Sequence, residues 1–196
     1  VLIKNKIPIT KGSKCKNNFI FFAGNFKTYT SNELLDKFSI IPRKDIIEKL
    51  HEISLDNHSI KIIDVKVEPI PIEKWYHELS RATFFVCPPG NYMPFCHHLK
   101  EAMSLGVIPI IEYSDLLFPH LEHNVNCINY NSIVDFEIKI KSILSMDDQK
   151  INWMSENCLD YYQNYMSDDS FIDKVVTKKK NKIYFNAGWL SVMLKK

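Results

Sequence analysis

Arginine is nearly absent from this 196-residue chain. Arg43 and Arg81 are its two arginines, while lysine, asparagine and isoleucine are abundant. This bias looks like nucleotide composition rather than protein chemistry, so an arginine retained against it is a candidate for a specific role. The net charge of +2 neither favours nor excludes a nucleic-acid partner.

Paired cysteines and long apolar runs are also missing. The five cysteines are widely spaced and include no CxxC pair: Cys15, Cys87, Cys96, Cys127 and Cys158. This pattern favours free thiols in a reducing compartment, so we expect a cytoplasmic protein. No apolar run approaches the roughly 20 residues of a membrane helix, and the first residues do not resemble a secretory signal. We expect no membrane span.

The familiar nucleotide and metal fingerprints are absent as well. The chain has no GKS or GKT and no GxGxxG. "MDDQ" and "SDDS" are not DxD motifs and stand where helix N-caps are expected. A zinc site could be suggested by the consecutive residues Cys96, His97 and His98 together with Cys87. However, consecutive ligands on one helical turn do not converge on a tetrahedral ion. We therefore expect no metal site.

Nucleic-acid binding would call for interleaved basic and aromatic residues on one surface. The one hint is a group of lysines near the C-terminal end, which we interpret as a solvated helix face: Lys178, Lys179, Lys180, Lys182, Lys195 and Lys196. We expect no nucleic-acid partner.

Short apolar segments alternate with amphipathic ones along most of the chain. The apolar segments predict strands at 19–24, 60–67, 83–87, 107–111 and 125–130. The amphipathic segments predict helices at 42–53, 71–82, 96–106, 132–144 and 145–165, with Gly106 closing the third. A last helix is expected to begin near residue 170.

One of these segments is ambiguous. "DFEIKIK", residues 135–141, alternates like a strand. Phe136, Ile140, Ile143 and Leu144 fit helical spacing, and we favour a helix for that reason. "SMDD", residues 145–148, resembles a capping box that opens the next helix.

This alternation predicts an α/β fold, a Rossmann-like parallel sheet with helices on both faces. We expect a lead-in segment at 1–18, a nucleotide-sugar-binding domain at 19–166 and a helical C-terminal extension at 167–196. Ligands of such sheets bind beyond the carboxyl ends of the strands. The loop 87–98 is therefore the first candidate site.

The chemistry of this loop suits a phosphate. Pro88 and Pro89 fix the backbone after the strand, and Gly90 can adopt conformations closed to other residues. The chain is then expected to enter a helix at about Cys96, whose first amides would face an anion.

Polar side chains follow on the same helix. His97 and Glu101 lie one turn apart, so His97 could donate to a phosphate or sugar oxygen and Glu101 could accept from ribose hydroxyls. Alternatively, the two residues form an ordinary contact on a wet helix. His98 borders the apolar face and could be a packing histidine. Cys96 could be a nucleophile, but no third group marks it as one.

The residues quoted next resemble a known family. "YHELSRATFFVCPPGN", "CHHLKEAMSLGVIPII" and "DLLFPH" are similar to the C-terminal half of exostosin-like glycosyltransferases, which have the GT-B fold. "FFAGN" and "PRKDIIEKL" resemble that family's opening strand and its Arg-bearing helix. The resemblance covers roughly residues 19 to 166.

The resemblance implies roles for particular residues. Gly90 and Asn91 would shape the phosphate loop, and Glu101 would bind the ribose. Arg43 would contact the diphosphate. Cys96, His97 and His98 would occupy a triplet that usually ends in arginine. His98 thus replaces a permanently charged group by one that is partly protonated near pH 7.

The implied function is that of a metal-independent glycosyltransferase without a cofactor, transferring sugar from a nucleotide diphosphate to a glycan or protein hydroxyl. A GT-B enzyme has two such domains, so a second Rossmann-like domain in this or another chain is an expected partner. Its general base cannot be nominated from this half, and Asp115 and His120 are weak catalytic candidates. The alternatives are a non-catalytic nucleotide-binding or protein-interaction module and, less favoured, a flavodoxin-like or receiver-like signalling domain.

Overall fold

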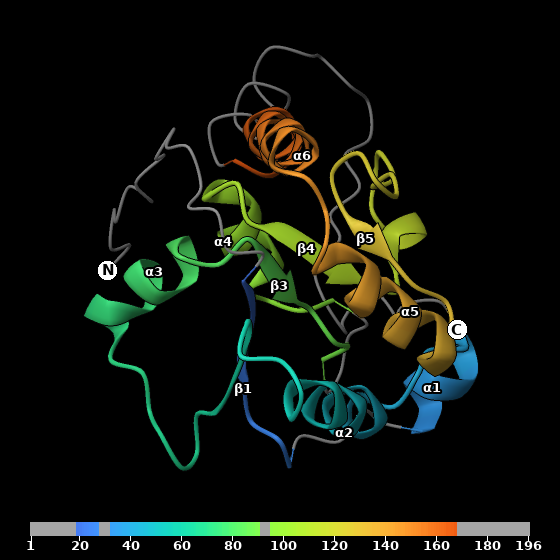
Figure 1. The fold of residues 1–196 in the computed structure, drawn as a ribbon. Coiled ribbons are helices and arrows are strands. Elements are labelled where there is room, and N and C mark those ends of the chain that lie inside the picture. The colour runs from blue at the N-terminus through green and yellow to red at the C-terminus, as the bar shows by residue number, and fades with distance from the viewer. Residues whose placement is uncertain (1–18, 28–31, 91–94, 168–196) are drawn as a thin grey trace, which may run out of the picture.

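A computed structural model describes residues 19–27, 32–90 and 95–167 of the chain. These residues form a five-stranded, fully parallel sheet in the order β2-β1-β3-β4-β5 (Figure 1). The strands are β1 (Ile20–Gly24), β2 (Ile60–Asp64), β3 (Phe84–Val86), β4 (Ile108–Ile111) and β5 (Ile128–Asn129). The predicted α/β class and Rossmann-like sheet are confirmed.

The central strands are apolar because both faces of the sheet are covered. Every residue of β3 and β4 is buried, as is β1 up to Gly24. Continuous apolar runs of this kind are typical of parallel strands between two helical layers. In the register, Ile20 pairs with Ile60 on one side and with Phe84 on the other.

Helices pack on both faces of the sheet. The structure has helices α1 (Asn32–Phe38), α2 (Arg43–Ser54), α3 (Ile72–Ser80), α4 (Leu99–Ser104), α5 (Ile133–Ile143) and α6 (Asp148–Tyr161). α2 packs against α5 on one face, and α4 packs against α6 on the other (Figure 1). The buried faces of α2 and α5 are those that the sequence pattern predicts.

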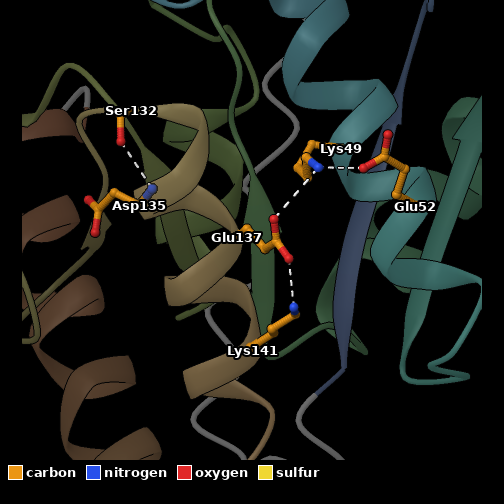
Figure 2. Close-up of polar contacts among 6 residues, drawn as sticks. All are labelled: Lys49, Glu52, Ser132, Asp135, Glu137 and Lys141. Carbon is orange, nitrogen blue, oxygen red and sulfur yellow. Dashed lines mark hydrogen bonds and ion pairs between the residues drawn. The ribbon is translucent and has the colours of Figure 1, made fainter.

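Charged side chains connect α2 to α5 at the surface. Lys49 of α2 contacts Glu52 on its own helix and lies 3.6 Å from Glu137 of α5 (Figure 2). Lys141 pairs with the same Glu137 one helical turn away, at 2.6 Å. Exposed pairs of this kind contribute little stability individually, so the apolar faces dominate the packing of the two helices.

Two helix starts show how local sequence determines local structure. Ser132 caps α5 by accepting a hydrogen bond from the backbone of Asp135 at 3.0 Å (Figure 2). The segment that alternates like a strand is therefore a helix, as predicted. α6 begins later than the SMDD pattern suggests. Its N-cap is Asp147, which accepts from the backbone of Lys150, so the reading of Ser145 as a capping-box residue was wrong.

Two other local predictions differ from the structure. α1 was not predicted. α4 begins at Leu99 rather than near Cys96, because Cys96 to His98 form a turn before it. The end of α4 is as predicted: Gly106 has φ of +65°, a left-handed conformation that suits glycine after a helix. The Ser155 hydroxyl of α6 donates to the Gly106 carbonyl at 2.6 Å.

Two of the expected segments lie outside the described residues: the lead-in at 1–18 and the helix expected to begin near residue 170. Within the described part of the chain, no helix has the length and apolar character needed to cross a bilayer.

Candidate ligand-binding site

A cavity of about 660 Å³ opens at the carboxyl edge of the sheet, where β1 and β3 end. The chain proceeds from β1 to β2 on one side and later crosses to β3 on the other. Crevices at such a reversal of strand order are the usual ligand sites of doubly wound sheets. The cavity also has the size and partly apolar lining typical of small-molecule sites.

Arg43 supplies a cation to this cavity. It is the first residue of α2, and its guanidinium lies over the Phe22 ring at 5.5 Å from the centroid. One terminal nitrogen donates to the Pro89 carbonyl at 3.4 Å, and Nε is buried without a hydrogen-bond partner. Burial lowers the pKa of Arg43, but an arginine stays charged in proteins.

Arg43 forms no ion pair in the part of the chain that the structure describes, although the Glu101 carboxylate lines the same cavity. Arg81, the other arginine, is exposed and lies near Glu78. A half-buried guanidinium with an unsatisfied donor is costly unless an anion binds it. The cavity is therefore suited to an anionic ligand.

Gly24 leaves the space that the Arg43 side chain occupies. It ends β1, and a Cβ built on it would overlap the Arg43 guanidinium. A Cβ at this position would also come within 3.0 Å of the Phe22 ring. The lack of a side chain at Gly24 thus sets where the cation lies.

A second wall of the cavity is apolar. It is formed by the segment after β2 and by α3 and β3: Val65, Pro69, Ile70, Ile72, Trp75 and Phe85. Ile72 is 67% exposed at this wall. A ligand with a charged part and a flat or apolar part would match both walls.

Glu101 and His98 form a hydrogen-bonded pair beside Trp75 of the apolar wall. Glu101 Oε2 lies 2.7 Å from His98 Nδ1 and accepts a hydrogen bond from Trp75 Nε1 at the same distance. Burial opposes ionisation of Glu101, but the hydrogen bonds from His98 and Trp75 outweigh it and hold its pKa below the ordinary value. The carboxylate is therefore charged at neutral pH. Its partner is His98 rather than His97, which the sequence spacing had suggested.

Two thiols and a tyrosine lie together at Cys96, one of the residues that line the cavity. The Cys96 amide donates to the Tyr113 hydroxyl at 2.8 Å. Cys87 and Cys96 are both buried, and their side chains are hydrogen-bonded. This bond, with nearby His98 and Arg43, lowers the pKa of Cys96 to about 7 despite burial, while burial raises the pKa of Cys87.

The cavity brings together most of the residues singled out from the sequence. Its lining includes Arg43, Gly90, Cys96, His97, His98 and Glu101. Asn91 lies outside the described residues. Asp115 and His120 are exposed and are not among the lining residues, so as catalytic candidates they stay predictions.

The source of anion-binding groups differs from expectation. α4 has six residues and begins three positions after Cys96, so Cys96 does not stand at a helix start. Among the described residues that line the cavity, the side chains able to bind an anion are those of Arg43, His97 and His98.

The sequence did not assign Phe22, Trp75 or Phe85 to the site. Phe22 and Phe85 follow the rule that residues near the carboxyl ends of the central strands face the crevice. The helical spacing around Trp75 indicated only that its side chain packs in the core. Its hydrogen bond to Glu101 was not predictable, because it joins two helices that are distant in the sequence.

Among the residues that the structure describes, no three or more His, Cys, Asp or Glu side chains gather in a way that could hold a metal ion. In comparisons with known proteins, neither a family model nor a curated sequence matches this chain.

Proposed function

We propose that this chain is the donor-binding domain of a glycosyltransferase, which holds a nucleotide diphosphate sugar in the cavity at the ends of β1 and β3. The observation that carries the proposal is Arg43, a half-buried cation with an unsatisfied Nε and no carboxylate partner among the described residues. The resemblance of residues 76–120 to exostosin-like enzymes agrees with this location.

The two walls of the cavity fit the two parts of such a donor. Arginine recognises phosphate oxygens through a planar set of donors, so the diphosphate would lie beside Arg43 and Gly90. The aromatic and aliphatic wall at Ile70 and Trp75 would receive the less polar part of the ligand. Glu101 is a charged acceptor in the cavity lining, where it would accept a hydrogen bond from a ligand hydroxyl.

In this proposal the chain contributes binding and leaving-group stabilisation. Fixed cations beside a diphosphate stabilise the negative charge that develops as the sugar departs. The acceptor, a glycan or protein hydroxyl, and the base that removes its proton would come from a second domain. We therefore expect the chain alone to bind donor without transferring sugar.

The test is a calorimetric titration of the chain with UDP, GDP, TDP and CMP, with and without EDTA. We expect one nucleotide diphosphate to bind selectively and independently of metal. Arg43→Ala should weaken its binding at least tenfold, because a charge-assisted contact contributes roughly 1.5–3 kcal/mol. Glu101→Ala should weaken it as well.

Arg81→Ala is the matched control, because it removes an exposed arginine that is not among the lining residues. It should leave the affinity unchanged. A folded wild-type protein that binds none of these nucleotides would contradict the proposal and favour a protein-interaction module. Binding that Arg43→Ala does not weaken would place the nucleotide elsewhere.

A further inference from the structure

The His98 ring is held in one orientation by three elements. Its Nδ1 lies 2.7 Å from Glu101 Oε2 of α4. The ring lies against Trp75 of α3, with centroids 4.4 Å apart, and edge-on to Phe85 of β3 at 6.2 Å. His98 lines the cavity, and its Nε2 has no hydrogen-bond partner among the described residues.

The Glu101 contact determines which ring nitrogen can change its protonation state. An ionised carboxylate only accepts hydrogen bonds, so Nδ1 carries a hydrogen whether the imidazole is neutral or cationic. Trp75 donates to the same oxygen and helps keep Glu101 ionised. Nε2 is therefore the atom at which His98 gains or loses a proton.

We propose that His98 Nε2 is a phosphate contact that takes up a proton when the donor binds, which makes donor affinity fall as pH rises. The inference rests on the proposed function. The oxygens of a diphosphate esterified at both ends are acceptors only, and so is Nε2 of the neutral imidazole. A hydrogen bond between them requires the imidazolium, so binding favours the protonated ring.

This property belongs to the histidine and would be absent from an arginine. The guanidinium is charged throughout the accessible pH range and binds phosphate without proton exchange. At the place of His98 an arginine would be a constant anion contact, whereas the histidine would be one that responds to pH.

Other ionisable groups surround this ring and require controls. They are His97, whose ring centroid lies 3.8 Å away, Glu101 on α4, Cys96 and Cys87 in the loop, Arg43 on α2 and Tyr76 on α3. Cys96, with a pKa of about 7, is the strongest competitor as a source of proton exchange. Burial and the neighbouring His98 lower the pKa of His97.

The experiment is calorimetric titration with UDP-glucose, GDP-mannose and dTDP-glucose in buffers of different ionisation enthalpy. These doubly esterified diphosphates do not themselves titrate near neutral pH. For the donor that binds, the wild-type protein should take up as much as about one proton, and affinity should fall by up to about tenfold per pH unit on the alkaline side.

The variants assign the proton. His98→Gln should lose the proton uptake and the pH dependence, and so should His98→Arg, which should also bind more tightly than wild type at pH 8. His97→Gln and Cys96→Ser should keep the wild-type uptake. Binding without proton uptake by the wild type, or unchanged uptake in His98→Gln, would overturn this inference and leave the proposed function standing.

Failure of the folded wild-type protein to bind any of the three donors would overturn both. If His98→Gln does not fold, because the ring packs on Trp75, the uptake measured for the wild type and His98→Arg decides the question.

Discussion

At the scale of single residues, Gly24 and Arg43 share one small space. The guanidinium lies where a Gly24 side chain would be, and it reaches the Pro89 carbonyl across the end of β1. Burial keeps this charge away from bulk water without a counter-ion among the described residues. A side chain introduced at Gly24 should therefore act by displacing the Arg43 guanidinium.

Gly24→Ala should weaken nucleotide binding about tenfold, because its methyl group displaces the Arg43 guanidinium from the cavity wall. Isothermal calorimetry with the nucleotide that binds the wild type measures this effect. In an Arg43→Ala background, the same substitution should have little further effect. Equal losses in both backgrounds would mean that Gly24 acts through something other than Arg43.

The residues around the cavity were only partly predictable from sequence. Arg43, His98 and Glu101 were singled out, but the pairing of Glu101 with His98 and Trp75 was not. A helix beginning at Cys96, as expected from the sequence, would have made His97 the partner of Glu101. Because a turn precedes α4, it is His98 and not His97 that contacts Glu101. No local sequence pattern predicts the contact between Glu101 and Trp75 of α3.

At the scale of helices and strands, the N-caps of α5 and α6 are the clearest local determinants. Ser132 Oγ accepts from the Asp135 amide and Asp147 Oδ1 from the Lys150 amide. Each satisfies one of the helix-start amides that have no partner within the helix. Ser145, by contrast, donates to the Ser142 carbonyl at the end of α5.

Ser132→Ala and Asp147→Ala should each lower the free energy of unfolding by about 1 kcal/mol. Ser145→Ala should cost less than half of that, since it caps no helix start. Urea denaturation followed by circular dichroism measures all three. A larger loss for Ser145→Ala than for Asp147→Ala would restore the capping-box assignment that the structure rejects.

Most elements were predictable because apolar spacing differs between strand and helix. The alternating segment 135–141 was correctly assigned because Phe136, Ile140 and Ile143 form one buried helical face. The start of α4 was misplaced because the polar turn at His97 and His98 has no feature that distinguishes it from a first helical turn. α1 was missed, and it is the one described helix that precedes the well-patterned α2.

At the scale of the whole molecule, Glu112 joins the end of β4 to the segment that precedes α2. It follows β4, and its Oε1 accepts from the Ile41 amide, just before α2, at 2.7 Å. Its Oε2 is buried without a hydrogen-bond partner. Burial raises the pKa of Glu112 to about 7.

Stability should therefore fall as pH rises from about 5 to 7. The unfolded chain releases the Glu112 proton near its ordinary value of 4.5, while the folded chain retains it until about 7. Below that window both states are protonated, and above it the folded state holds an unfavourable charge.

Glu112→Gln should raise the free energy of unfolding at pH 8 by about 1 kcal/mol, less than the full shift implies because the side chain is only half-buried. Denaturation at pH 5 and pH 8 compares the two proteins. Asp115→Asn, at an exposed position, is the control. An unchanged difference between the two pH values in Glu112→Gln would exclude this carboxyl as the cause.

The central place of β1 in the sheet has a consequence for synthesis. This strand leaves the ribosome first among the five, yet both of its neighbours, at Ile60 and Phe84, are translated much later. Until β2 and β3 have been synthesised, the apolar residues of β1 cannot be buried in a complete sheet. A nascent chain halted before β3 would therefore expose the apolar residues of β1 and depend on chaperones. Premature termination at that point should yield aggregates rather than a smaller folded domain.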